Sequence, residues 1–105
     1  MKIKTLEQIK KQLQSGHFEL TRHALKRQVE RNISRNDIRE IGENIVIIED
    51  YPDDKYSPSS LLLGFTKIQK VLHLQVSRIE SDITKIITLY EPSQKEWIEY
   101  KIRRD

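Results

Sequence analysis

VLHLQVSRIESDITKIITLY, residues 71–90, decides the fold because two strand-like patterns flank a short polar interruption. Leu72, Leu74 and Val76 alternate with other side chains, which is the period of a strand that buries one face. Ser81-Asp82 is typical of a turn, and Ile83–Tyr90 is again rich in β-branched residues. The stretch therefore predicts two antiparallel strands joined by a short connection.

Two further strands are predicted upstream of this pair. Ile45–Tyr51 is rich in β-branched residues, and Ser60–Ile68 follows after a loop that begins with Pro52-Asp53-Asp54-Lys55 and continues through Ser57-Pro58. Short connections between successive strands favour an antiparallel meander. We therefore expect four neighbouring strands in chain order.

Helical patterns occupy the part of the chain before these strands. Leu6, Ile9 and Leu13 share one face of a helix that begins at Thr5 and stops at Ser15-Gly16. After a short extended segment, Phe18–Leu20, two more helices are expected, the first running from a Thr21 cap to about Asn32 and the second from a Ser34 cap with Asp37 three residues on to near Gly42. A last helix, capped by Ser93, is expected to carry Trp97, Tyr100 and Ile102.

The order of these elements predicts an α+β fold in a single domain spanning residues 1–105. N-terminal helices should pack on one face of the four-stranded antiparallel sheet, since that face must be buried, and the C-terminal helix should follow it. The 105 residues are only 36% hydrophobic and 33% charged, which suits a small domain with a large surface.

The composition also excludes several classes of protein. With no cysteine, the chain has no disulfide scaffold, no thiolate nucleophile and no cysteine-ligated zinc site. Its N-terminus lacks the apolar segment of a signal peptide, and its apolar runs are too short to span a bilayer. We expect a cytoplasmic protein.

Basic residues gather in one part of the chain. The formal net charge is +3, and the segment Thr21–Arg35 holds five Lys or Arg residues against one acid, Glu30. Such a segment is either a solvated helix face or a surface for an anionic partner.

The helix expected from Thr21 places possible functional groups on one side. Leu25 and Val29 should seat it on the sheet, which leaves His23 and Arg27 one turn apart on the opposite side, with Arg31 close by. The alternative is an ordinary polar face exposed to solvent.

A second group of candidates lies on the last two strands. His73 is on the face opposite Leu72 and Leu74, and Thr88 and Tyr90 share a face at i and i+2. If the two strands pair, the three side chains can line one concave surface. The alternative is that His73 and Tyr90 are ordinary sheet residues with satisfied hydrogen bonds.

These residue types suit the cleavage of RNA. The 2′-OH of RNA is its own nucleophile, so cleavage needs a base, an acid and positive donors on the phosphate. His23 and His73 could serve as base and acid in either order, and Arg27 could hold the phosphate. Thr88 and Tyr90 would position the substrate. No metal or other cofactor is required, and no spacing typical of metal ligands is present. Lys26 and Arg31 would assist RNA binding, and Tyr56 could stack on a base.

Four segments resemble, in matching order, a bacterial family of domains of unknown function. They cover about residues 17–100 and read LTRHALKRQVERNISRNDI (20–38), EDYPDDKYSPSSLLLGF (49–65), VLHLQVS (71–77) and IITLYEPSQKEW (86–97). The family is grouped with the barnase–EndoU–colicin–RelE (BECR) fold. The resemblance implies a RelE-like toxin of a bacterial toxin–antitoxin pair that acts as a metal-independent endoribonuclease. It also implies a cognate antitoxin, often with a small zinc finger, and functional roles for His23, Arg27, His73, Thr88 and Tyr90.

Two other functions stay open at this point. The chain could be a binding module that holds RNA or a protein through the same basic helix without catalysis. It could also be a structural interaction protein that uses none of these side chains.

Overall fold

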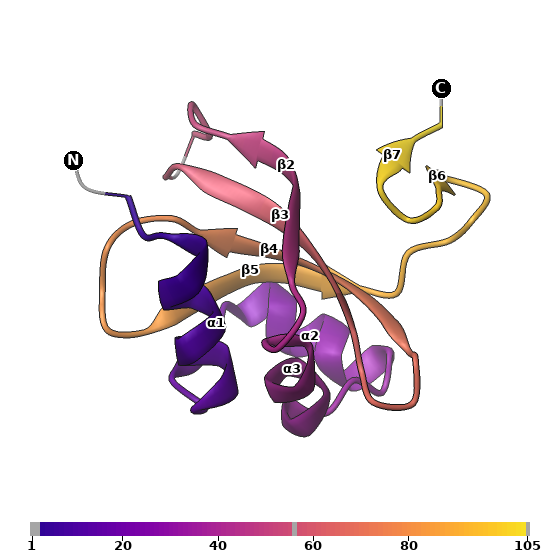
Figure 1. Cartoon of the computed structure of the whole chain (residues 1–105), viewed down its shortest axis with the longest axis horizontal. Coiled ribbons are helices and arrows are strands. Elements are labelled where there is room, and N and C mark those ends of the chain that lie inside the picture. Colours follow the sequence, from indigo (N-terminus) through magenta and orange to yellow (C-terminus); the bar gives the residue numbers. More distant parts are fainter. Residues whose placement is uncertain (1–2, 56, 105) are drawn as a thin grey trace.

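The computed structural model describes residues 3–55 and 57–104, in which helices come first and strands follow (Figure 1). The helices are α1 (Leu6–Gln14), α2 (Arg22–Glu30) and α3 (Arg35–Ile41). The strands are β1 (Phe18–Leu20), β2 (Val46–Tyr51), β3 (Ser59–Phe65), β4 (Val71–Ser77), β5 (Thr84–Tyr90), β6 (Trp97–Ile98) and β7 (Ile102–Arg103). The predicted α+β class is confirmed.

The main sheet has five strands in the order β1-β5-β4-β3-β2. Strands β2 to β5 form the expected antiparallel meander. The prediction of four strands is wrong because β1 adds to the outer edge of β5 in parallel, with Phe18 opposite Thr84. Backbone hydrogen bonds from Thr84 to His17 and from Thr21 to Ile86 continue this pairing beyond both ends of β1. The sheet is therefore mixed.

Polar caps begin the helices where the sequence predicts them. Thr5, Thr21 and Ser34 each accept a hydrogen bond from a backbone N–H in the first turn. Thr5 and Ser34 also form capping boxes with Gln8 and Asp37, so two otherwise unpaired N–H groups are satisfied at each of these helix starts.

The helices cover one face of the sheet and enclose the core (Figure 1). Leu72, Leu74 and Val76 of β4 point into this core, as their alternation predicts. Helix α3 crosses β3 so closely that a Cβ on Gly64 would lie 2.6 Å from the Cβ of Ile41. Glycine at position 64 is therefore needed for this contact.

Helix α2 does not sit on the sheet through the predicted side chains. Leu25 and Val29 are 53% and 75% exposed, whereas Ala24 is fully buried. The hydroxyl of Thr21 caps the helix and donates to the carbonyl of Ile87, which fixes the start of α2 beside β5. A small side chain at position 24 allows the close approach, and the larger apolar side chains then point outward.

The predicted C-terminal helix is absent from the described residues after Pro92. A two-stranded hairpin of β6 and β7 stands in its place, apart from the helices in Figure 1. Glu99 and Tyr100 have φ angles of 51° and 64°, which no α-helix contains. Trp97 anchors the hairpin by packing against His73, and Arg103 lies over the Trp97 ring.

Candidate functional site

The sheet face opposite the helices carries most of the polar side chains of the strands. On β4, His73, Gln75 and Ser77 point to this face because they alternate with the core residues. Pairing of β4 with β5 places Tyr90 beside His73 and Thr88 beside Gln75. We call this surface the open face, although the β6–β7 hairpin covers the part around His73.

One cavity at the edge of the open face gathers several candidate residues. It measures about 390 Å³ and is lined by Arg27, Arg31, Thr88, Tyr90, Glu91, Glu96, Trp97 and Arg103. We call it the basic cavity. The first four of these residues were all singled out from sequence, and they come from α2 and β5. The local cause is the Thr21 cap, which aligns α2 along β5 so that Arg27 and Arg31, one turn apart, face the strand.

The charges in the basic cavity are only partly neutralised. Arg103 pairs with Glu49 at 3.0 Å, and Glu91 pairs with Lys70 at 3.4 Å. Within residues 3–55 and 57–104, the guanidinium groups of Arg27 and Arg31 have no hydrogen bond or ion pair. Their donors are therefore free to bind an anion, and a guanidinium fork matches a phosphate in both shape and charge.

His73 lies directly behind Tyr90 and is fully buried. Its Nε2 is 2.6 Å from the carbonyl oxygen of Tyr100, which can only accept, so Nε2 carries the hydrogen. In the neutral ring, Nδ1 is then an acceptor for the Tyr90 hydroxyl at 3.1 Å. The ring of Trp97 closes the other side, with its centroid 4.5 Å from that of His73. His73 thus reaches the basic cavity only through Tyr90.

Burial sets the protonation states of this pair. It lowers the pKa of His73, an effect that the hydrogen bond to Tyr100 and the charge of Glu49 partly oppose. Burial also raises the pKa of Tyr90 to about 12. At neutral pH the imidazole is therefore uncharged and the phenol protonated. Tyr90 gives its hydrogen to His73 and keeps oxygen lone pairs for a ligand in the cavity.

The remaining candidates lie elsewhere. His23 is exposed and lines a different cavity, of about 490 Å³, with Lys85 and Ile87 among its neighbours. The structure therefore does not bring His23 together with Tyr90 in one cavity. Lys26 is exposed on α2 outside the basic cavity. Tyr56 lies outside the described residues.

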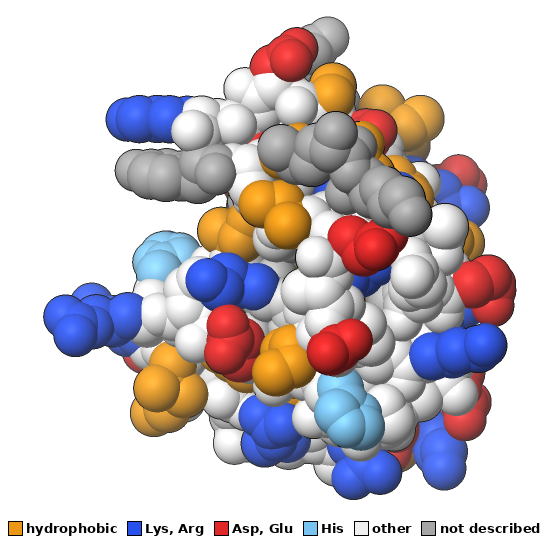
Figure 2. All heavy atoms as spheres, turned by 90° about the vertical axis from the view of Figure 1, so that its left-hand side faces the viewer, with side chains coloured by type: hydrophobic (Ala, Val, Ile, Leu, Met, Phe, Trp, Pro, Cys, Tyr) orange, Lys and Arg blue, Asp and Glu red, His pale blue; other side chains and the backbone are white. Residues whose placement is uncertain are grey.

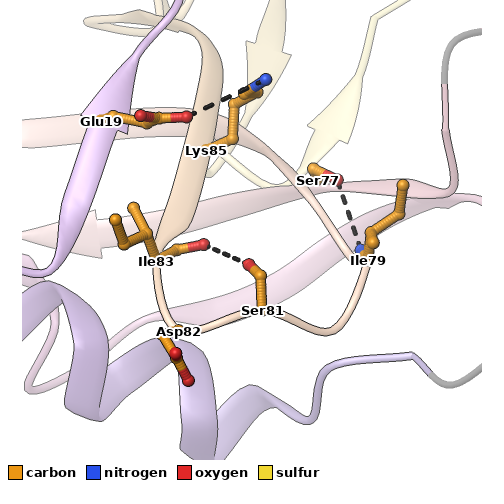
Figure 3. Close-up of a pocket in the computed structure, with 7 residues that line it drawn as sticks. All are labelled: Glu19, Ser77, Ile79, Ser81, Asp82, Ile83 and Lys85. Carbon is orange, nitrogen blue, oxygen red and sulfur yellow. Dashed lines mark hydrogen bonds and ion pairs between the residues drawn. The ribbon is translucent and has the colours of Figure 1, made fainter.

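A cavity of about 380 Å³ near the start of β5 has a different character (Figure 3). Its polar groups already bind one another: Lys85 pairs with Glu19, and the Ser81 hydroxyl donates to the carbonyl of Ile83. The adjoining face of the molecule shows basic and acidic side chains interspersed (Figure 2). We therefore place the functional site at the basic cavity.

Arg103 is the functional residue that sequence analysis missed. It appeared to belong to a solvated basic tail after the last helix, yet it contacts Glu49 and the Trp97 ring and lines the basic cavity. The β-branched Ile98 and Ile102 flanking a short polar stretch were the available sign of a hairpin.

Two further observations concern the described part of the chain. It contains no group of three or more His, Asp or Glu side chains that could hold a metal ion. None of its helices is both long and apolar enough to cross a membrane.

Comparison with known proteins gives one match. No curated protein and no solved structure matches the chain. A family model, described as a domain of unknown function, matches residues 20–91. This range includes Arg27, Arg31, His73, Thr88 and Tyr90, and it ends before Trp97 and Arg103. Since the match covers more than half of the sequence, the chain belongs to the DUF4258 family.

Proposed function

We propose that this protein binds and cleaves RNA at the basic cavity as a metal-independent endoribonuclease. One observation carries the proposal: Arg27, Arg31 and Arg103 meet the hydroxyl-bearing side chains of Thr88 and Tyr90 in a single cavity. Guanidinium groups bind phosphate oxygens, and hydroxyl groups can donate to the same oxygens or accept from a sugar hydroxyl. A phosphodiester next to a ribose is the ligand that uses both kinds of group.

The two unpaired guanidinium groups would stabilise the reaction. As the 2′-oxygen attacks phosphorus, negative charge grows on the phosphate oxygens that do not leave. Donors already in place lower the energy of that state, by about 3–4 kcal/mol for each well-placed donor. Arg27 and Arg31 fit this role because within the described residues nothing else binds their side chains. Arg103 is held by Glu49 and would shape the other side of the site.

Tyr90 and His73 would remove the proton of the nucleophile together. The 2′-OH gives its proton to the Tyr90 oxygen while Tyr90 passes its own proton to Nδ1 of His73. The 2′-oxygen then forms a bond to phosphorus, and the bond from phosphorus to the 5′-oxygen breaks. The departing 5′-oxygen takes a proton from water, which leaves a 2′,3′-cyclic phosphate and a 5′-hydroxyl. His73 returns its proton to water through Tyr90.

This mechanism gives the two histidines different roles from a simple acid–base pair. His73 would accept a proton without touching RNA, because the hairpin covers it. His23 precedes Arg27 by one helical turn and would contact a neighbouring nucleotide, as would Lys26 and Tyr56.

In the cell, we propose a cytoplasmic toxin of a type II toxin–antitoxin pair with a RelE-like BECR fold. The segments quoted above for the family resemblance support this role, as does the arrangement of helices on one sheet face and candidate groups on the other. The partner would be a cognate antitoxin, possibly of the zinc-finger type. Expression of the chain alone should stop growth, and co-expression with the protein encoded next to it should restore growth.

The cleavage proposal is tested with end-labelled RNA in EDTA. Wild-type protein should cut the RNA and leave a 2′,3′-cyclic phosphate end, and Tyr90→Phe should cut at least 100-fold more slowly, the lower end of the usual contribution of proton transfer, about 10² to 10⁴. RNA binding by Tyr90→Phe should stay within about twofold of wild type, a difference of less than about 0.5 kcal/mol. Equal cutting by both proteins would contradict the role of Tyr90.

The burial of His73 also favours a second candidate, an RNA-binding module without catalysis. No described imidazole in the basic cavity can reach a ligand directly. In that case wild-type protein would bind RNA through Arg27 and Arg31 and would not cut it in the same assay.

A further inference from the structure

A second cavity adjoins the basic cavity and has the opposite polarity. It measures about 580 Å³ and is lined by Tyr51, Pro52, Asp53, Asp54, Gln75 and Arg103. We call it the acidic cavity. Arg103 lines both cavities, so a ligand that extends past this side chain can occupy the two at once. The acidic cavity lies on the open face, where the end of β2 meets the middle of β4.

Hydrogen bonds fix the side chain of Gln75 in this cavity. Its Nε2 donates to Asp54 at 3.2 Å and to the Ser59 hydroxyl at 3.1 Å, so both amide hydrogens are used. Ser59 in turn donates to the same Asp54 oxygen at 2.8 Å. An amide flip would lose both bonds. Oε1 of Gln75 is therefore held as an acceptor, and no donor binds it within residues 3–55 and 57–104.

The cavity offers acceptors and an aromatic ring to a ligand. Asp53 is exposed at the rim and contributes a carboxylate, which accepts only. The Tyr51 hydroxyl donates to Glu49, which fixes its ring at the cavity wall. Two carboxylates exclude a phosphate from this cavity. A flat group that carries N–H donors on one edge fits it, because the ring can stack on the aromatic side chain and the edge can donate to the oxygens.

We propose that the acidic cavity selects the base of the nucleotide whose phosphate occupies the basic cavity, and that it prefers guanine. The inference rests on the proposed RNA function. Guanine presents N1–H and N2–H₂ side by side on its Watson–Crick edge, which gives neighbouring donors for Gln75 Oε1 and Asp53. Adenine, cytosine and uracil each present one donor group beside acceptors on that edge. An acceptor facing the carboxylate is repelled, so these bases bind less well.

The test is an NMR titration of the full chain with the four ribonucleoside 3′-monophosphates and with inorganic phosphate. Guanosine 3′-monophosphate should bind at least tenfold more tightly than the other three nucleotides. Asp53→Asn replaces an acceptor with a donor, and Gln75→Met removes the fixed acceptor. Both substitutions should abolish the preference and leave phosphate binding unchanged. Asp82→Asn makes the same charge change in the cavity of Figure 3 and should alter nothing.

The outcomes separate the two proposals. Equal binding of the four nucleotides, with phosphate still bound, overturns the base preference alone. So does a guanine preference that survives Asp53→Asn, a substitution at an exposed position that the fold tolerates. If neither phosphate nor any nucleotide binds to the wild-type chain, the proposed RNA function itself is wrong.

Discussion

Tyr90 and His73 are direct partners in the β4–β5 ladder, and their side chains also meet, with a 3.1 Å hydrogen bond and ring centroids 5.2 Å apart. The backbone register therefore fixes the side-chain contact. Because Tyr100 accepts from the other ring nitrogen, protonation of His73 would turn Nδ1 into a donor and release the Tyr90 hydrogen toward the cavity.

The first prediction concerns stability against pH. The folded state lowers the pKa of His73, so the unfolded chain binds a proton at this residue more readily. The stabilising effect is complete above the unfolded pKa, about 6.5, and is lost as the pH falls below it. Urea unfolding should give a free energy that decreases between about pH 7 and about pH 5.5.

His73→Gln is the matched control for this prediction. It removes the titrating ring and keeps an amide that can bond to Tyr90. The variant is less stable overall, yet its free energy of unfolding should vary less over the same pH range. An identical pH dependence in both proteins would show that His73 does not cause it.

The second prediction compares two arginines on α2. Arg27 lines the basic cavity, whereas Arg22 is exposed outside it. Arg27→Ala should reduce the rate of RNA cleavage at least tenfold, equivalent to about 1.4 kcal/mol. Arg22→Ala removes the same charge from the same helix and should change the rate less than about twofold, or about 0.4 kcal/mol. Similar losses in the two variants would indicate a general charge effect without a specific phosphate site.

The third prediction concerns the hairpin anchor. Trp97 is 3% exposed and packs on His73. Trp97→Ala should lower the free energy of unfolding by about 3 kcal/mol, near the low end for a buried aromatic side chain, since the hairpin is at the surface. It should also expose His73, so the pKa of this histidine should rise toward about 6.5 in an NMR titration.

Trp97→Phe separates the two effects of that substitution. A smaller aromatic ring keeps part of the cover, so both the stability loss and the pKa change should be smaller. If Trp97→Ala left the His73 pKa unchanged, the hairpin would not be what buries the ring.

The fourth prediction tests the contact between α3 and β3. Gly64→Ala would place a Cβ 2.6 Å from Ile41 Cβ and 3.2 Å from Ile45 Cγ2. Overpacking of this kind costs about 1–3 kcal/mol, and thermal unfolding should show a lower Tm. The double variant Gly64→Ala with Ile41→Val should not regain the loss fully, since the closest atom is Cβ, which valine retains. A Tm equal to that of wild type would contradict the close packing.

Much of the fold follows from periodicity in the sequence. The alternation in 71–77 and the caps Thr5, Thr21 and Ser34 were enough to place the antiparallel strands and the helix starts. The strand β1 was not predictable as part of the sheet. It has three residues, and its partner β5 lies more than 60 residues away, so no local pattern reports the pairing.

The errors in α2 and the C-terminal segment share a physical cause. Both predictions assumed that large apolar side chains at helical spacing face the core. On α2 the N-cap contact with β5 and the small Ala24 decide the orientation instead, which leaves Leu25 and Val29 exposed. After Pro92, packing of Trp97 on a buried imidazole outweighs local helix propensity.

The candidate site was predictable where a single element or a neighbouring pair holds it. The i, i+4 spacing of Arg27 and Arg31 and the shared face of Thr88 and Tyr90 depend only on local geometry. The cover over His73 depends on a hairpin more than 20 residues further along the chain. Contacts at that separation are set by tertiary packing, which the sequence pattern does not contain.

The span of the basic cavity along the chain, from Arg27 to Arg103, has a consequence for biosynthesis. Helix α2 is made early, but the strand beside which it rests and the last guanidinium come some 60 to 70 residues later. A growing chain on a ribosome therefore carries no complete site until residue 103 has been added. The proposed enzyme would be harmless to its own messenger RNA during most of its translation.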